Sequence, residues 1–407
     1  MTKKSDTPAI RFKGFSDAWE QRKFGEITSK YEDPVPTPHD GYYRLGIRSH
    51  AKGTFHSYVA KGQELETAQM HRVAAGNFIV NITFGWEHAV AITDKNDAGK
   101  LVSHRFPQFS FAEGMVPEFF RYVIVDEKFR HHLWLASPGG AGRNRVLKLD
   151  EMLNYLMRFP SRDEQIKIAE FFRHLDNLIT LHQRKFEKLT NVKKSMLEKM
   201  FPQNGSSYPE IRFKGFTDPW EQRKAIDIAD YSKGNGYSKG DLTDVGTPII
   251  LYGRLYTKYQ FVINEVDTFA VPRNVAVYSQ GNEVIVPASG ETAEDIARAS
   301  AVEKSGVLLG GDLNILRPFD FINPLFLALA ISNGEPQKEL AKKAQGKSVV
   351  HIHNTDIQEV TIAYPSKTEQ DRIVSVFRQL DNLITLHQRE LEKLQNIKKS
   401  MLEKMFV

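Results

Sequence analysis

The sequence predicts an α+β protein: two mixed α/β domains joined by two long antiparallel coiled-coil helices, arranged as a pseudo-two-fold tandem repeat. Two internal duplications carry this prediction. The segment IRFKGFSDAWEQRK at 10–23 returns at 211–224 with 12 of 14 residues unchanged, and 175–201 returns at 380–406 with 23 of 27 unchanged. A seven-residue apolar period through the second pair indicates that both copies are helices that pack against each other.

The duplication sets the expected boundaries within the 407 residues. Each half has a short constant segment, a variable block and a constant helix. The expected parts are a first domain at 1–160 that includes the constant segment 10–23, a central helix at 161–201, a linker at 202–210, a second domain at 211–365 and a C-terminal helix at 366–407. The stretch FPQNGSSYPE at 201–210 consists of turn residues, and nothing in it is expected to pack.

The two constant helices have the same start signal and the same apolar seam. Ser161 is followed by Glu164, and Ser366 by Glu369, which is the spacing of a capping box. No Pro or Gly interrupts the sequence from there to Met200 or Met405, so each helix is expected to be about 60 Å long. Four polar residues fall on the otherwise apolar seam and are expected to fix its register: His182, Lys193, His387 and Lys398.

The variable blocks mix strand-like and helix-like runs, and both end in the same pattern. We expect strands at 76–85, 282–290 and 311–318, and helices at 117–136 and 323–344, the second of them broken. The block ends DEMLNYLMRFPS and TDIQEVTIAYPS lie 205 residues apart and match in pattern. Both blocks are therefore expected to have one α+β fold with diverged surfaces.

Composition limits the classes of function. The N-terminal residues contain no apolar run typical of a signal peptide, and the apolar run at 324–331 is too short to cross a bilayer, so a cytoplasmic protein is expected. There are no cysteines, which excludes disulfides and thiolate zinc sites. The net charge is +5, and the whole excess lies in 161–200 and 366–405. A nucleic-acid surface elsewhere would therefore be a local patch.

Nothing in the sequence indicates an active site. AKKAQGKS at 341–348 resembles a phosphate-binding loop, but a helix precedes it and a strand follows it, which reverses the order that phosphate binding needs. His351 and His353 could lie on one strand, yet no third metal ligand accompanies them. Motifs of amino-group methyltransferases are missing. We therefore expect no catalytic residue, no metal and no cofactor in this chain.

Candidate DNA-binding residues lie in glycine-punctuated loops rich in Arg, Lys, Tyr and Asn. Arg reads guanine, Asn reads adenine, and Tyr can hold phosphates. The candidates are Tyr42, Tyr43, Arg44, Arg48, Arg143, Asn144, Arg145, Lys233, Asn235, Tyr237, Lys239, Arg254, Tyr256, Lys258, Lys347 and Ser348.

The chain resembles the specificity subunit of type I restriction–modification systems. The resemblance rests on RFKGFxDxWEQRK at the start of each half, on the twin P-S-x-x-E-Q … LDNLITLHQR … LEKMF helices, and on KGNGYSKGDLTDVGTPIILYGRLYTKY at 233–259. It implies two target-recognition domains that each read one half of a bipartite double-stranded DNA site. It also implies helices that set the gap and dock two methyltransferase subunits.

The same resemblance places catalysis in other subunits. The methyltransferase subunits would use S-adenosylmethionine to methylate adenine N6, and restriction and translocase subunits would use ATP and Mg. Two alternatives stay open: a coiled-coil scaffold that presents two protein-binding modules without DNA, and an enzyme with a concealed nuclease or transferase site. Salt-dependent, sequence-specific DNA binding would distinguish a DNA-recognition subunit from the DNA-free scaffold. Activity of the isolated chain would reveal a concealed enzyme site.

Overall fold

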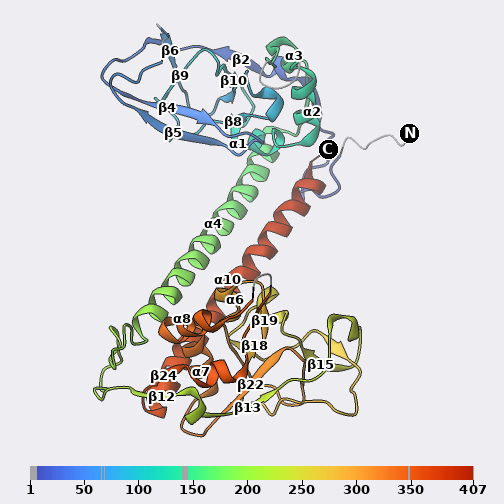
Figure 1. Cartoon of the computed structure of the whole chain (residues 1–407). Coiled ribbons are helices and arrows are strands. Elements are labelled where there is room, and N and C mark those ends of the chain that lie inside the picture. Colours follow the sequence, from blue (N-terminus) through green and yellow to red (C-terminus); the bar gives the residue numbers. More distant parts are fainter. Residues whose placement is uncertain (1–6, 66, 68, 140–144, 347–348, 407) are drawn as a thin grey trace. The chain divides into compact units, whose positions relative to one another are not determined.

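A computed structural model describes residues 7–65, 67, 69–139, 145–346 and 349–406. The chain forms two compact units. Unit 1 comprises Met1–His182 and Glu390–Val407, and unit 2 comprises Gln183–Arg389. The long helices α4 (Arg162–Lys199) and α10 (Lys367–Met405) therefore each contribute one half to either unit (Figure 1).

Unit 1 contains two main sheets and three short helices beside its share of the long helices. The sheets have the strand orders β2-β10-β7-β8 and β3-β6-β9-β4-β5, and β1 pairs with β11. The elements are β1 (Glu20–Lys23), η1 (Phe24–Glu26), β2 (Thr28–Tyr31), β3 (Pro34–Pro36), β4 (Tyr42–Ile47), β5 (Thr54–Val59), β6 (Gln69–Arg72), β7 (Phe78–Val80), η2 (Gly85–Glu87), β8 (Val90–Ile92), β9 (Leu101–Val102), β10 (Gln108–Phe111), α1 (Pro117–Val123), α2 (Glu127–Leu135), α3 (Leu149–Leu153) and β11 (Leu156–Phe159).

Unit 2 has a different variable block between equivalent ends. Its larger sheets have the orders β13-β22-β18-β20-β16 and β14-β17-β15-β21, and β12–β24 and β19–β23 form ribbons. The elements are β12 (Glu221–Lys224), η3 (Ala225–Asp227), β13 (Ala229–Lys233), η4 (Lys239–Asp241), β14 (Leu242–Thr243), β15 (Thr247–Ile250), α5 (Arg254–Thr257), β16 (Val262–Ile263), β17 (Phe269–Ala270), β18 (Glu283–Pro287), β19 (Ser289–Gly290), α6 (Ala293–Ile296), β20 (Ser300–Val302), β21 (Leu308–Leu309), β22 (Leu313–Pro318), α7 (Pro324–Ile331), α8 (Gly334–Lys343), β23 (Val350–His351), α9 (Asn354–Gln358) and β24 (Thr361–Tyr364).

The constant segments bind the variable blocks in the same way twice. EQRK of each copy forms the strand that pairs antiparallel with the last strand of its block, with Glu20 opposite Phe159 and Glu221 opposite Tyr364. The buried Gln165 accepts a hydrogen bond from the Val116 amide before α1. Gln370 does the same for the residue before α7. Each block is thereby joined to its constant segment along its last strand, and to its constant helix just before α1 or α7.

The long helices pack antiparallel, as predicted. In unit 1 the ring of Phe172, near the start of α4, lies 5.9 Å from that of Phe406, just after α10. In unit 2 Phe377, near the start of α10, lies 6.4 Å from Phe201, just after α4. The predicted seam positions are buried or half-buried in both helices, whereas most positions between them are exposed. The seven-residue period thus marks the contact between the helices.

Four expectations about local structure need correction. The run at 117–136 forms two helices, because the β-branched Val123–Val125 region has low helix propensity and Asp126 starts α2. The strand expected at 76–85 ends at Val80, where the Asn81 side chain accepts from the Thr83 amide and starts a turn. The other two corrections concern Glu164 with Glu369, and Phe201.

Both capping-box carboxylates have a different role. Glu164 is fully buried and binds Arg11 through both oxygens, and Glu369 binds Arg212 in the same way. Phe201, expected at the edge of an unpacked linker, is 5% exposed and stacks on Phe326 at 5.5 Å. Burial of the large Phe201 ring stabilises the fold, and a solvent-exposed turn at this position would lose that stabilisation.

Candidate nucleic-acid interface

A cavity of about 300 Å³ opens beside β4 and β5 of unit 1 and combines arginines with aromatic rings. Arg44 of β4 and Arg105 after β9 line it, and no described residue forms an ion pair or hydrogen bond with either guanidinium. Asn81 adds an amide, and Phe84 and Phe106 supply apolar surface. Unpaired guanidinium groups beside an amide are the donors that read base edges and phosphates in DNA.

The hairpin β4–β5 also exposes aromatic side chains. Tyr43 and Tyr58 face each other across the strands with ring centroids 5.2 Å apart, and each is more than half exposed. Arg48 lies over the Phe55 ring at 5.3 Å and also donates to the Thr54 carbonyl. Tyr42 differs from them, since it is 6% exposed and belongs to a buried cluster. Its position favours a role in the core over a role at the surface.

In unit 2 most candidate side chains are already engaged within the fold. Arg254 and Lys258 both bind Asp267, at 2.5 and 2.6 Å, and these bonds lower the pKa of the Asp267 carboxyl. The Tyr256 hydroxyl donates to the Ser289 carbonyl, and burial raises its pKa. Tyr237 is buried and accepts from the Arg273 amide.

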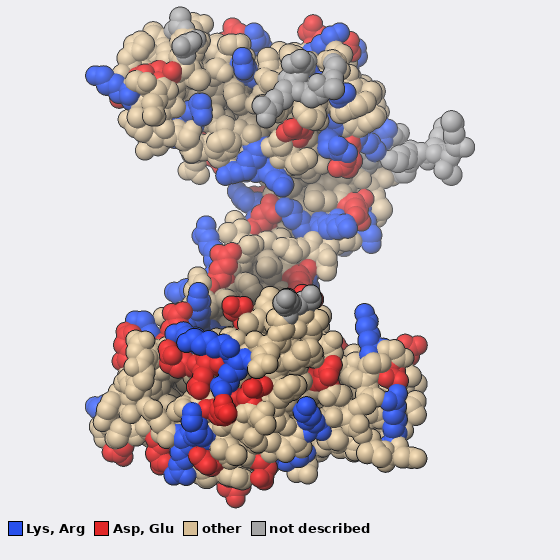
Figure 2. Space-filling model, viewed as in Figure 1, with Lys and Arg blue, Asp and Glu red and all other residues tan. Residues whose placement is uncertain are grey.

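Apart from Asn235, the remaining candidates of unit 2 are either surface residues or lie outside the described residues. Asn235 is half-buried and also engaged within the fold, since it donates to the Val275 carbonyl at 2.5 Å, whereas Lys233 and Lys239 are exposed. Figure 2 shows acidic and basic side chains interspersed on the visible face that α8 and α6 belong to. On this face of unit 2 the basic side chains lie close to acidic ones, whereas the two arginines of the unit 1 cavity have no acidic partner among the described residues.

Arg143, Asn144, Lys347 and Ser348 lie outside the described residues. Arg145 is described, and its guanidinium lies 4.8 Å from the Trp134 ring centre. DNA contact by every candidate residue stays a prediction.

The seam lysines pair across the helices in both units. Lys193 of α4 binds Asp381 of α10 at 2.5 Å, and Lys398 of α10 binds Asp176 of α4 at 2.6 Å. Tyr122 donates a further hydrogen bond to Asp176, and burial raises the pKa of Tyr122. His182 and His387 are half-buried on the same seam. One-to-one pairing of Lys with Asp favours a single register, and the register role of the four seam positions stays a prediction.

Arg105 and Asn81 line the unit 1 cavity but are not among the candidates predicted from the sequence. Arg105 lies in SHRFP, a short polar loop before β10 without the glycines that marked the other candidates. A search for arginines beside prolines and aromatic residues could have found it. Among the described residues no cluster of His, Asp or Glu could hold a metal ion, and no described helix is long and apolar enough to cross a membrane.

Comparison with known proteins agrees with this geometry. Residues 217–396 match the family described as type I restriction modification DNA specificity domain. The type I restriction enzyme MjaVIII specificity subunit of Methanocaldococcus jannaschii is 21% identical over 293 residues, which cover 69% of this chain and 68% of that protein. The crystal structure of the type I restriction–modification S subunit from M. genitalium has the same fold, with a TM-score of 0.61, 12% identity and coverage of 98% and 99%.

The chain resembles the specificity subunits of type I restriction–modification systems, and the matched family domain covers residues 217–396. The HsdS subunit from Thermoanaerobacter tengcongensis also matches over 95% of this chain and 96% of its own, at 17% identity and a TM-score of 0.44. This resemblance supports the predicted recognition of DNA sequence over the DNA-free scaffold, and the shared fold confirms the predicted fold class. The specificity subunits that the chain resembles are in general non-catalytic.

Proposed function

We propose that each variable block of this specificity subunit reads one half of a bipartite double-stranded DNA site, and that α4 and α10 set the unread gap. The observation that carries the proposal is the contrast between the two copies. The constant segments repeat their strand pairing and their buried Arg–Glu ion pair, whereas the blocks between them differ in sheet order and in surface chemistry. Two different variable blocks held by the same repeated constant elements fit a DNA site with two different halves.

The helices also carry a repeated surface that fits two copies of a partner. Leu181 and Leu386 occupy the same place in the duplicated LDNLITLHQR segments and are 46% and 51% exposed. A large apolar side chain exposed at the same site in each copy favours a protein contact made twice. We propose two methyltransferase subunits as these partners, with restriction and translocase subunits joining the assembly.

Catalysis in this proposal belongs to the partners. The methyltransferase subunits would use S-adenosylmethionine, and the restriction and translocase subunits ATP and Mg. The sequence supports this division because it contains no methyltransferase motif and its phosphate-loop lookalike is misplaced. Purified alone with DNA and S-adenosylmethionine, the chain should transfer no methyl groups, and methyl transfer by the isolated chain would contradict the proposal.

A paired helix extension tests the division between reading and spacing. Four residues inserted after Thr190 and four after Gln395 lengthen each helix by about 6 Å, close to two base-pair steps. Both half-site sequences should persist while the gap grows by one or two base pairs, measured by methylome sequencing of a host that expresses the variant with its partners. An insertion after Thr190 alone is the control, because it shifts one heptad seam against the other and should weaken assembly. Altered half-sites with an unchanged gap would refute the proposal.

A further inference from the structure

Residues 271–275, with the sequence VPRNV, form a short segment after β17 in the sheet that contains β15 (Figure 1). Its two valines, Val271 and Val275, are 65% and 73% exposed, and Val245, two residues before β15, is 80% exposed. These three are the most exposed large apolar side chains in the part of the chain that the structure describes. A group of solvent-exposed valines at one place marks a surface that gains from being covered by a ligand.

The segment is fixed to the residues that precede β14. The Arg273 amide donates to the Tyr237 hydroxyl at 2.8 Å, and the Arg273 guanidinium lies 4.8 Å from the centre of the Tyr237 ring. The same guanidinium donates to the Gly236 carbonyl and forms an ion pair with Asp241. Tyr237 itself belongs to a buried apolar cluster. The segment is therefore held in one conformation before any ligand binds.

Both ends of the segment are held as well. Ala270 is the last residue of β17, and a Cβ atom on Gly246 would lie only 2.7 Å from the Ala270 carbonyl oxygen. This close packing brings Val245 next to the start of the segment. At the other end the Asn235 side chain donates to the Val275 carbonyl at 2.5 Å. The three exposed valines therefore belong to one fixed surface.

Asn274 is the exposed amide of this surface, and no described residue forms a hydrogen bond with its side chain. An asparagine amide can bind N6 and N7 of adenine together, and apolar side chains contact the C5 methyl group of thymine. One A·T base pair presents all of these groups in the major groove. Arg273 does not suit the reading of guanine here, because its guanidinium already binds the Gly236 carbonyl and Asp241. The surface therefore matches an A·T pair.

Basic side chains flank this surface. Lys233 and Lys239 precede and follow the residues that bind Arg273, and both are exposed. Neither lysine forms an ion pair with a described residue, whereas the Asp241 carboxylate is paired with Arg273. Lysines in such positions hold the phosphates on either side of a base contact.

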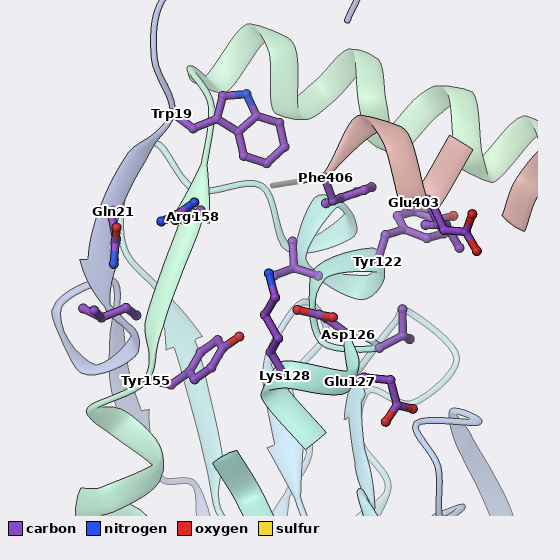
Figure 3. Close-up of a pocket in the computed structure, with 14 residues that line it drawn as sticks. Trp19, Gln21, Tyr122, Asp126, Glu127, Lys128, Tyr155, Arg158, Glu403 and Phe406 are labelled. Atoms are coloured by element: carbon purple, nitrogen blue, oxygen red, sulfur yellow. The ribbon is translucent and has the colours of Figure 1, made fainter. Parts of the chain in front are cut away.

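A groove of about 530 Å³ beside the β1–β11 ribbon of unit 1 has a different character (Figure 3). Asp126, Glu127 and Glu403 line it together with Lys128 and Arg158. Carboxylates at the rim repel phosphates, so a hollow surface alone does not indicate a contact with DNA. The valine surface of unit 2 differs from that groove by its unpaired amide and its flanking lysines.

We propose that residues 271–275 enter the major groove and read an A·T base pair, with Asn274 on the adenine and Val275 against the thymine methyl group. The inference rests on the proposed function, since it names the side chains and the base pair through which the second variable block reads its half-site. Asn235 and Tyr237, both candidates predicted from the sequence, then contribute by fixing this segment and not by contact with a base.

Asn274→Ala tests the reading of adenine. Methylome sequencing of a host that expresses the variant with its partners should show one A·T position of one half-site relaxed to any base, with the other half-site unchanged. In fluorescence anisotropy with the assembled complex, affinity for the cognate duplex should fall about tenfold. Asn264→Ala is the matched control and should change neither result, because Asn264 is exposed but lies outside the segment. Relaxation of a G·C position instead, or an unchanged DNA preference, would overturn the proposal.

Val275→Ala tests the contact with thymine. Replacement of that thymine by uracil removes the methyl group from the cognate duplex and should weaken binding of the parent complex about fourfold. In the Val275→Ala complex the same replacement should have no effect, because the apolar contact is already lost. Equal losses in the parent and in the variant would mean that Val275 does not contact the methyl group.

The outcomes separate this inference from the proposed function. A parent chain that gives no two-part methylation pattern with its partners would refute the proposed function itself. A normal parent pattern that Asn274→Ala leaves intact would refute only the reading by this segment. If Val275→Ser keeps the DNA preference but prevents co-purification with the methyltransferase subunits, the valines form a protein contact, and the reading of an A·T pair is refuted.

Discussion

Arg11 and Glu164 form a two-bond ion pair in which Nε and Nη2 of the guanidinium each lie 2.7 Å from a carboxylate oxygen. The Glu164 side chain is fully buried and that of Arg11 is 13% exposed. Arg212 and Glu369 repeat the pair in unit 2, at 2.8 Å for both bonds. A buried carboxylate tolerates this position only while its partner is present. The pair therefore fastens each constant segment to the start of its helix.

Removal of the arginine should destabilise its own unit. Arg11→Ala leaves Glu164 buried without a partner, which we expect to lower the free energy of unfolding of unit 1 by about 3 kcal/mol. Urea unfolding followed by tryptophan fluorescence measures the change. Arg22→Ala is the control, because its pair with Glu20 is exposed and should contribute less than about 0.5 kcal/mol. Equal effects of the two substitutions would contradict this role of Arg11.

The seam pair Lys193–Asp381 should show a measurable coupling energy. Both side chains are partly exposed, at 21% and 28%, so solvent screening limits the coupling to about 0.5–1 kcal/mol. A double-mutant cycle of Lys193→Ala and Asp381→Ala, read by thermal unfolding, measures it. Exchange of the two residues should recover most of the lost stability, and 0.5 M salt should reduce the coupling. Strict additivity of the single changes would mean that the pair does not hold the register.

The sequence predicted these helices well because their signals are local and repeated. The heptad period marks every buried seam position from Phe172 to Met200, and it reports contacts that depend only on spacing along one helix. The block ends at 150–161 and 355–366 were also predicted as equivalent, and each forms a short helix followed by a strand.

The partners of individual polar side chains were not predictable in this way. Glu164 satisfies the capping-box spacing, yet it binds an arginine 153 residues away. Arg254 lies in a segment with the composition of a DNA-binding loop, but its guanidinium forms an ion pair with Asp267. Spacing says which residues share a face, whereas ion-pair partners depend on tertiary contacts. For that reason the candidate site was predicted less well than the frame.

Unit 1 should lose stability in mildly acidic solution through His88. This side chain is 3% exposed and lies 2.7 Å from the Ile124 carbonyl, and desolvation lowers its pKa below the ordinary value of 6.5. Below about pH 6.5 His88 binds a proton in the unfolded chain but stays neutral in the folded chain. The contribution of neutral His88 to the free energy of unfolding is therefore complete above that pH. As the pH falls toward the folded pKa, this contribution decreases by up to about 1.4 kcal/mol per pH unit.

His88→Asn should remove this part of the pH dependence. Asn tolerates the positive φ of 61° at this position and keeps an amide donor. Urea unfolding from pH 5 to 7.5 provides the comparison, with the exposed His174→Asn as the control. If the stability of the His88→Asn protein falls with pH as steeply as that of the parent, His88 is not the titrating group.

The Arg44–Arg105 cavity should read one half of the DNA site. Arg44→Ala or Arg105→Ala should cost about 1–3 kcal/mol of binding free energy to cognate DNA if the guanidinium contacts a base edge. The loss should relax one or two positions of a single half-site and leave the other half intact, as methylome sequencing would reveal. Arg22→Ala should change neither affinity nor sequence preference. Relaxation of both halves by Arg44→Ala would contradict its assignment to one reader.

The last prediction concerns a chain cut to one repeat. The core of unit 1 includes Met405 from the end of α10, and Phe406 packs against it, with its ring 5.6 Å from Phe119. The Ile10 amide donates to the Lys404 carbonyl at 3.0 Å, just as Ile211 donates to Lys199 at 2.9 Å in unit 2. Because KKSMLEKMF occurs at the end of both helices, the first repeat contains its own copy of the missing piece.

Residues 7–207 alone should therefore form a symmetric dimer in which Met200 and Phe201 of each copy fill the core of the other. The buried seam and the exchanged helix ends together favour an obligate pair, since each copy alone would expose the ring of Phe172 and its neighbours. Sedimentation equilibrium should give twice the monomer mass, and Phe201→Ser should shift the chain toward monomer together with a loss of folded structure. A stable, folded monomer of residues 7–207 would refute the idea that the helix end of one repeat completes the core of the other.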